Sequence, residues 1–101
     1  MIKHIVCFKL ADNNARNCAQ AKQVLESMKG KVPTAKEIAV NVDELKSPRS
    51  FDIMLEVLVD SWEALEEYQN DPYHCNIVKK HMRAVSQQSI SLDFEQEEGT
   101  K

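Results

Sequence analysis

The sequence predicts an α+β domain, in which a four-stranded antiparallel sheet carries two helices. Three segments alternate apolar and polar residues and a fourth is a short, nearly continuous apolar run, which are the patterns of half-exposed and of buried strands. Two other segments place apolar residues three or four positions apart, which is the pattern of amphipathic helices. Turn-forming residues separate these segments. Their order along the chain is strand, helix, strand, strand, helix, strand.

The first strand is predicted over residues 2–10, where every second residue is apolar except for one histidine. This row comprises Ile2, His4, Val6, Phe8 and Leu10. Asp12 or Asn13 is expected to cap the helix that follows, and Gly30 is expected to end it. The apolar stripe of this helix comprises Cys18, Ala21, Leu25 and Met28.

Two strands follow the first helix. The earlier one is predicted around Ile38, Val40 and Val42, which alternate with polar residues, so one of its faces is expected to be exposed. The later one is predicted over residues 51–59, where the apolar run is nearly continuous, as in a central strand that is buried on both faces. The turn-rich residues 46–50 join the two strands.

A second helical region begins near Asp60 or Ser61, either of which can cap it. Its residues Trp62, Leu65 and Tyr68 fall on one side of a helix. We therefore expect these three side chains to pack against the sheet.

This region is expected to break and restart at residues 70–72, because Pro72 suits the first position of a helix and Asp71 suits its cap. The new apolar stripe comprises Cys75, Val78 and Met82. The apolar residues of the fourth predicted strand are Ile90, Leu92 and Phe94. We expect residues 1–95 to form the domain and residues 96–101 to be a disordered acidic tail.

The order β-α-β-β-α-β is that of the ferredoxin-like fold, in which both helices cover the same face of the sheet. The other face then stays open, although the predicted strands are apolar there as well, at Ile5, Cys7, Met54 and Leu58. Because a large exposed apolar patch favours association, we expect a second copy of the chain to cover it. The sequence therefore predicts a homodimer through the open sheet face.

Composition argues against several classes of partner. The sequence pI is near 5.6 and the longest basic cluster is Lys79-Lys80, which does not suit a nucleic-acid interface. No stretch approaches about 20 consecutive apolar residues and the start lacks a signal-peptide pattern, so we expect no membrane partner and a cytoplasmic location. The three cysteines, Cys7, Cys18 and Cys75, form no C-x-x-C pair, and we expect buried free thiols with no bound metal or cofactor.

Three segments carry a family resemblance: IKHIVCFKL at residues 2–10, VDSWEALEEY at residues 59–68 and YQNDPYH at residues 68–74. Together they resemble the stress-responsive A/B barrel (Dabb) family, and the resemblance runs from about Met1 to Phe94. It implies a dimeric α/β barrel, in which two ferredoxin-like sheets face each other. The resemblance does not identify an activity, because folds of this kind carry many different activities.

The resemblance also implies site residues. In a plant polyketide cyclase of this family, a histidine and a tyrosine at the broken second helix carry out acid–base catalysis, and His74 and Tyr68 match them in position. His4 is similar to a histidine of the first strand that lines the cyclase pocket. The other residues that we expect to line the pocket are Val6, Phe8 and Ile53.

Each of these side chains also has a structural interpretation. His74 follows a helix N-terminus, whose positive dipole end favours the neutral imidazole that a general base requires, yet a histidine there can simply bond to the backbone or to Tyr68. Tyr68 suits the core as well as a catalytic donor. His4 lies in an apolar row and needs either a polar partner or a cavity. His81 is about two helical turns from His74, too far to share a metal ion without another ligand.

Two functions from different classes fit these observations. The first is a small-molecule-binding protein or enzyme, in which His74 removes a proton next to a carbonyl, Tyr68 is its hydrogen-bond partner and the ligand is apolar or phenolic. The second is a non-catalytic, dimeric, stress-associated interaction domain whose own side chains fill the pocket. An open cavity of a few hundred cubic ångströms around His74 favours the first.

Overall fold

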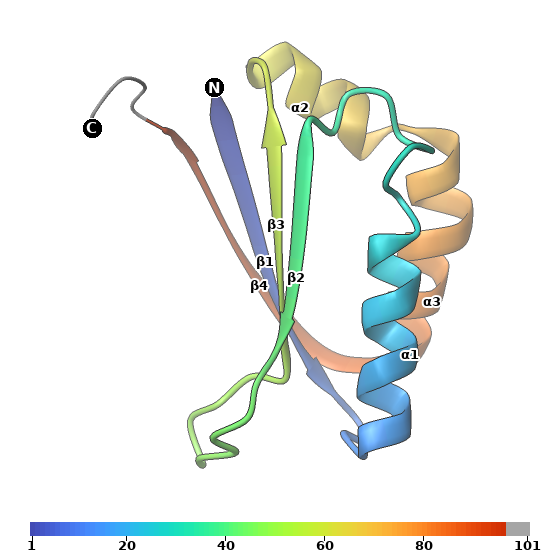
Figure 1. The fold of residues 1–101 in the computed structure, drawn as a ribbon, viewed down its shortest axis with the longest axis vertical. Helices are drawn as coiled ribbons and strands as arrows, with labels where there is room; N and C mark the ends of the chain where they lie inside the picture. Colours follow the sequence, from blue (N-terminus) through green and yellow to red (C-terminus); the bar gives the residue numbers. More distant parts are fainter. Residues whose placement is uncertain (97–101) are drawn as a thin grey trace.

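The computed structural model describes residues 1–96 and shows a four-stranded antiparallel sheet with helices on one face (Figure 1). The strands are β1 (Ile2–Leu10), β2 (Glu37–Val42), β3 (Ile53–Val59) and β4 (Ser86–Glu95). The helical segments are α1 (Ala15–Glu26), α2 (Trp62–Gln69), the π-helical η1 (His74–Lys79) and α3 (Lys80–Val85), which continues η1. The predicted α+β fold with its β-α-β-β-α-β order is confirmed, and the sheet of one chain stays open rather than closing into a barrel.

Strand pairing decides which side chains face the helices. The strand order is β2-β3-β1-β4, so β1 lies between β3 and β4. His4 lies opposite Val57 of β3 and Asp93 of β4. The next residue, Ile5, lies opposite Leu92. Since opposite residues of an antiparallel pair point to the same face, the row that contains His4 faces the helices and the row that contains Ile5 faces the open side.

The core lies between the sheet and the helices. Its fully buried side chains come from β3 and from the helical layer, and they include Leu25, Met28, Leu55, Val57, Tyr68 and Val78. Among residues 1–96, none of the helices combines the length and the apolar character needed to cross a membrane. The predicted tail, residues 96–101, lies outside the described residues except for Gln96, whose N–H donates to the carbonyl of Met1 at 2.8 Å.

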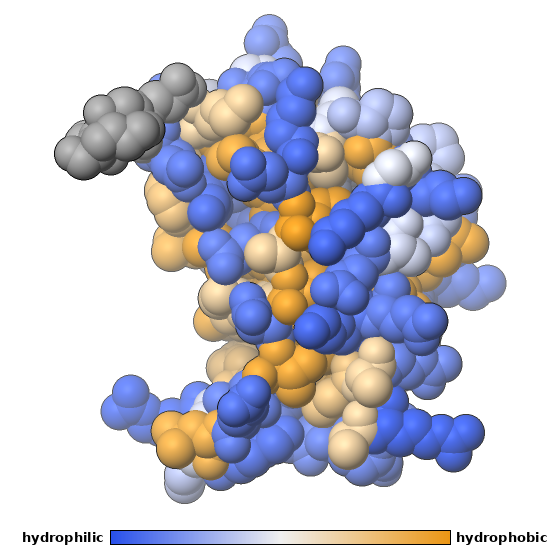
Figure 2. All heavy atoms as spheres, viewed as in Figure 1, coloured by the Kyte–Doolittle hydropathy of each residue, from blue (hydrophilic) through white to orange (hydrophobic). Residues whose placement is uncertain are grey.

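The face that no helix covers carries exposed apolar side chains. On β4, Ile90 is 51% exposed, Leu92 is 62% exposed and Phe94 is 38% exposed. Ile90 and Leu92 lie opposite Cys7 and Ile5, so all of them point to the open face. Figure 2 shows hydrophobic side chains along the margin of the molecule that faces away from the helices of Figure 1. The sequence therefore predicted the apolar character of this face correctly.

The cap of α1 differs from the prediction. It is Asn14 rather than Asp12 or Asn13, because the Asn14 side chain accepts a hydrogen bond from the N–H of Asn17 at 2.8 Å. Asn13 is used elsewhere, since its side-chain amide donates to Asp52 at 2.9 Å. Several adjacent polar residues could each cap this helix. The contact between Asn13 and Asp52 leaves Asn13 unable to do so.

The end of α1 also differs from the prediction. The helix stops at Glu26, and turns occupy residues 27–31. Gly30 lies within these turns at a φ of +79°, which glycine adopts without a steric penalty. It therefore reverses the chain after the helix rather than ending the helix itself.

The strand β3 begins at Ile53, after the predicted start at residue 51, because Asp52 bonds to the segment that joins β1 to α1. Asp52 is buried. One of its carboxylate oxygens accepts from the N–H of Leu10 at 2.8 Å, and the other accepts from the side chain of Asn13. Asp52 thus holds the end of β1 and the start of the helical layer in place.

Replacing Asp52 with alanine is expected to lower the free energy of unfolding by about 2–3 kcal/mol, because the buried N–H of Leu10 would lose its acceptor. Asp12→Ala is the matched control, since the Asp12 side chain is exposed and makes no hydrogen bond to any of the described residues, 1–96. It is expected to change stability by less than about 0.5 kcal/mol. Urea denaturation of both variants measures the difference, and equal losses would contradict the role given to Asp52.

The second helical region is divided, as predicted. Ser61 is the cap of α2, and its hydroxyl accepts from the N–H of Ala64 at 3.1 Å. Tyr68 is fully buried, but Trp62 is 54% exposed, so its predicted packing on the sheet is wrong. The helix lies across one end of the sheet in Figure 1, where less strand surface is left to cover its first turn.

Asp71 caps the second part of this region, as predicted. One of its carboxylate oxygens accepts from the N–H of Tyr73 at 2.8 Å and from that of His74 at 3.1 Å. The π-helical η1 follows, in which each N–H bonds one residue further back than in an α-helix. The predicted stripe through Cys75 consequently shifts, and Cys75 is only partly buried. The buried residues are His74, Val78 and Met82.

Candidate functional site

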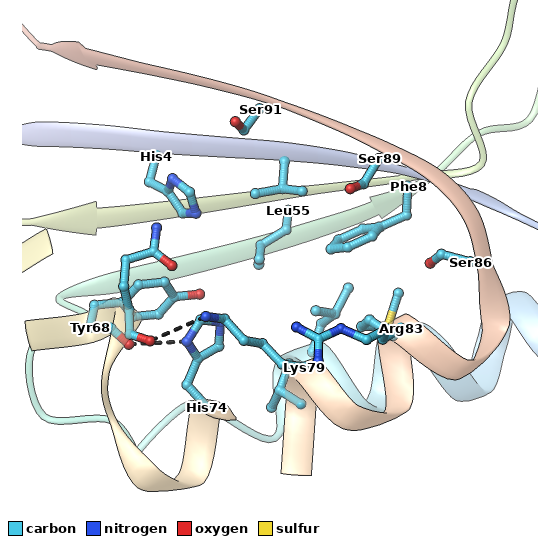
Figure 3. Close-up of a pocket in the computed structure, with 15 residues that line it drawn as sticks. His4, Phe8, Leu55, Tyr68, His74, Lys79, Arg83, Ser86, Ser89 and Ser91 are labelled. Carbon is cyan, nitrogen blue, oxygen red and sulfur yellow. Dashed lines mark hydrogen bonds between the residues drawn. The ribbon is translucent and has the colours of Figure 1, made fainter. Parts of the chain in front are cut away.

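A cavity of about 320 Å³ opens between the sheet and the η1–α3 segment (Figure 3). The strands β1, β3 and β4 form one wall, and α2, η1 and α3 form the other. Its apolar lining comprises Val6, Phe8, Leu25, Leu55, Val78 and Met82. Three aromatic polar side chains, those of His4, Tyr68 and His74, lie together at one end.

His74 lies at the start of η1, where the Asp71 cap fixes its backbone. Its Nδ1 lies 3.0 Å from the carbonyl oxygen of Tyr68. A carbonyl only accepts, so Nδ1 carries the proton and Nε2 is the ring's basic nitrogen. Nε2 has no hydrogen-bond partner among residues 1–96.

The environment keeps the His74 imidazole neutral. Burial first, and the positive charge of Lys79 after it, lower the pKa of His74 from 6.5 to about 4, against the opposing effect of the hydrogen bond to Tyr68. At neutral pH the ring is therefore uncharged. An uncharged ring with a free Nε2 can accept a proton from a molecule in the cavity.

Tyr68 lies under the ring of His74. The two rings stack, with their centroids 4.3 Å apart and their planes at 27°. Burial, and the charge of Asp71 after it, raises the pKa of the Tyr68 phenol well above its usual range. The hydroxyl therefore stays protonated, and it donates to the thioether sulfur of Met28 at 3.6 Å. Because a thioether is a weak acceptor, an oxygen of a ligand would be a better partner for this hydroxyl.

His4 completes a row of three rings. Its ring meets Tyr68 edge-on, with centroids 5.6 Å apart and planes at 64°. Its Nδ1 donates to a carboxylate oxygen of Asp93, the residue opposite it on β4. This bond fixes the tautomer of His4 and leaves Nε2 as its acceptor.

Asp93 was not among the residues predicted for the site. The sequence shows it only as a polar residue that alternates with Leu92 and Phe94, which is the pattern of any half-exposed strand. The missing information was the pairing register between β1 and β4, which places Asp93 opposite His4. A rule that pairs a lone histidine in an apolar row with a carboxylate on the neighbouring strand would have found it.

The structure brings most of the predicted pocket residues together. His4, Val6, Phe8, Tyr68 and His74 all line the cavity. Ile53 does not: it is buried in the core, and Leu55, two residues further along β3, lines the cavity in its place. Side chains of a strand that are two residues apart point to the same face, so the sequence indicates the face but not the position along it.

The lining of the cavity also carries positive charge, at two residues that were not predicted for the site. Lys79 and Arg83 both line the cavity, and the Nζ of Lys79 donates to the carbonyl of Gln69 at 3.3 Å. Three serine hydroxyls, those of Ser86, Ser89 and Ser91, line the opposite wall on β4. The cavity thus has two cations on its helical wall and three hydroxyl-bearing residues on its β4 wall.

The other reactive groups do not form a second centre. Among residues 1–96, no three histidine, cysteine or acidic side chains come together as metal ligands would. The described cysteines are free thiols, but only Cys18 is buried as expected, since Cys7 and Cys75 are partly exposed. Burial raises the pKa of both Cys7 and Cys18. The thiol of Cys75 donates a hydrogen bond to the carbonyl oxygen of Gln69 at 3.2 Å.

Comparison with known proteins agrees with this architecture. The family model of the Stress Responsive A/B Barrel Domain (Dabb) matches residues 2–96. No curated protein sequence matches the chain.

Three solved structures are similar in fold. A dimeric ferredoxin-like protein of unknown function from Thermobifida fusca has a TM-score of 0.81 at 19% identity, over 94% of this chain and 90% of that one. A hydroxynitrile lyase from Passiflora edulis has a TM-score of 0.78 at 16% identity, over 99% of this chain and 96% of that one. A Dabb family protein from Mesorhizobium loti has a TM-score of 0.70 at 15% identity, over 94% of this chain and 95% of that one.

Proposed function

Since the chain belongs to the stress-responsive A/B barrel (Dabb) family, we propose that it binds a small apolar or phenolic molecule in its cavity and catalyses cofactor-free acid–base chemistry on it. The observation that carries the proposal is the neutral, buried His74, whose free Nε2 lies in a cavity of about 320 Å³ beside the protonated Tyr68. The volume favours a ligand-binding cavity over one filled by the protein's own side chains.

The reaction class is removal of a proton from a carbon next to a carbonyl. Nε2 of His74 accepts the proton, the C–H bond breaks and its electron pair forms an enolate. The hydroxyl of Tyr68 donates a hydrogen bond to the oxygen on which the negative charge develops. The enolate then attacks a second carbonyl of the same molecule, as in an aldol-type cyclisation, and His74 returns the proton to the new alkoxide.

The dyad of His4 and Asp93 supports this chemistry from the other side of Tyr68. The Asp93 carboxylate holds His4 in the tautomer whose Nε2 accepts, and it balances positive charge on the ring if a proton arrives there. We assign His4 the role of binding a hydroxyl of the ligand, because its ring lies at the cavity wall beside Tyr68.

The comparisons support an enzymatic role without identifying a substrate. One structure of similar fold is a hydroxynitrile lyase, so this fold can carry an enzyme. The resemblance of His74 and Tyr68 to the acid–base pair of a polyketide cyclase favours the same division of roles.

We also propose that the protein is located in the cytoplasm.

We also propose that the protein is a homodimer, in which the open face of one sheet covers that of the other. The exposed apolar row on β4 supports this arrangement, since it continues the apolar side chains of β1 on the same face. Structures of similar fold are described as dimeric. This face also favours the second candidate function, a non-catalytic interaction domain, which needs the dimer but not the cavity.

A thermal-shift screen separates the two functions. Phenols, β-keto acids and their thioesters are tested against the wild type, His74→Ala and His81→Ala, the last being the matched control outside the cavity. A ligand at about 100 times its Kd stabilises the native state by about 2.7 kcal/mol. We expect this stabilisation in the wild type and in His81→Ala, and its loss in His74→Ala.

Two results of this screen would contradict the proposed binding site. If no compound stabilises the wild type, or if His74→Ala responds as fully as the wild type, the cavity is not a binding site built around His74. The interaction domain is then the better description of the protein.

A further inference from the structure

The cavity contains two cations without a carboxylate partner. Neither Lys79 nor Arg83 forms an ion pair within residues 1–96. Figure 3 shows the side chain of Arg83 extending from α3 toward Lys79, below Phe8. The chain as a whole has a net charge of −3, so this local positive charge contrasts with the rest of the protein. Unpaired cations that line a cavity attract anions into it.

The rest of the lining adds no negative charge and several donors. Within the described part of the chain, no aspartate or glutamate lines the cavity, and Asp93, which lies near it, is bonded to His4. On β4, the hydroxyls of Ser86, Ser89 and Ser91 lie across from the two cations.

Size and shape restrict the anion. A cavity of about 320 Å³ has room for a single-ring molecule, and its apolar lining at Phe8, Leu55 and Val78 suits the body of such a molecule. The planar guanidinium of Arg83 matches the two oxygens of a carboxylate.

We infer that the ligand of this cavity is a small carboxylic acid, bound as its carboxylate by Lys79 and Arg83 with its apolar or phenolic body against Phe8, Leu55 and Val78. This rests on the proposed function and adds the class of ligand to it. Both cations belong to the helical wall, and Lys79 lies beside His74, so the bound carboxylate lies on this wall and the body of the molecule extends toward the sheet.

The test compares two molecules that differ in charge but hardly in shape, 4-hydroxybenzoate and 4-hydroxybenzamide, by isothermal calorimetry at low ionic strength. We expect the carboxylate to bind the wild type on the order of ten-fold more tightly than the amide. In Arg83→Gln and in Lys79→Gln this preference is expected to fall to about three-fold or less.

Matched controls exist for both substitutions. Arg16→Gln removes an exposed arginine of α1, and Lys80→Gln removes the exposed lysine next to Lys79; neither residue lines this cavity. Both controls are expected to keep the full preference. If Arg16→Gln lowers it as much as Arg83→Gln does, the preference reflects the charge of the whole protein and the inference is wrong.

The outcomes separate this inference from the proposed function. Equal binding of the acid and the amide overturns the inference and leaves a cavity that binds neutral phenols. Binding of neither molecule counts against both. Phenyl phosphate is the third probe: if it binds more tightly than the benzoate, the anion is a phosphate and the assignment to a carboxylate fails.

Discussion

Replacing Leu92 with glutamate is expected to turn the proposed dimer into a monomer. Leu92 is 62% exposed in the single chain and lies opposite Ile5, within the apolar row that we propose to be covered by the partner. In a symmetric dimer the substitution places two charges in the apolar interface. Each uncompensated charge costs about 3 kcal/mol or more, so the two together raise the dissociation constant by a factor of at least about ten thousand.

Sedimentation equilibrium measures this change directly. The wild type is expected at twice the chain mass of 11.6 kDa, and Leu92→Glu at the chain mass itself. Ile77→Glu is the matched control, because Ile77 is also about half exposed, at 49%, but lies on η1 in the helical layer. A dimeric Leu92→Glu variant, or a wild type that is monomeric at micromolar concentration, would contradict the proposed interface.

Acidification from pH 6.5 to pH 4 is expected to lower the free energy of unfolding by about 3 kcal/mol through His74 alone. In the unfolded chain His74 takes up a proton near pH 6.5, whereas in the native state burial and the charge of Lys79 hold its pKa near 4. Between these values the unfolded state binds more protons, so stability falls as the pH falls. The contribution is fully present above pH 6.5.

The comparison with His74→Gln isolates this contribution from those of other groups. Glutamine keeps an N–H that can donate to the carbonyl of Tyr68, but it does not titrate. Urea denaturation at pH 7 and at pH 4.5 should show a loss in the wild type that exceeds the loss in His74→Gln by more than about 2 kcal/mol. His81→Gln is expected to behave as the wild type does. Equal losses in the wild type and in His74→Gln would mean that His74 is not held neutral.

Local pattern was sufficient to predict the sheet and the helices in order. Alternation over residues 2–10 and the break at Pro72 are features of neighbouring residues, and both correspond to the structure. The predicted cap at Asp71 is confirmed for the same reason, since a cap acts within three residues of itself. Trp62 shows what local pattern cannot predict. Its spacing places it on the apolar side of α2, but the spacing does not show whether the sheet extends far enough to cover that side chain.

The site was harder to predict because its contacts join distant parts of the chain. His4 and Asp93 are 89 residues apart, and only the register of β1 against β4 makes them neighbours. Lys79 and Arg83 fit the favourable position of cations at the end of a helix, and nothing local indicates that they also line a cavity. Sequence patterns therefore indicated the residue types of the site, and the strand register decided which of them meet.

The π-helical geometry of η1 makes the site sensitive to the deletion of a single residue from this segment. A π turn holds about one residue more than an α turn, so removing one residue from η1 would restore α-helical geometry. One residue corresponds to a rotation of about 100° around the helix axis. Met82 anchors α3 in the core, so the rotation would be taken up on the side of His74. A single deletion would thus separate the imidazole from the cations, although each of these side chains would still be present in the sequence.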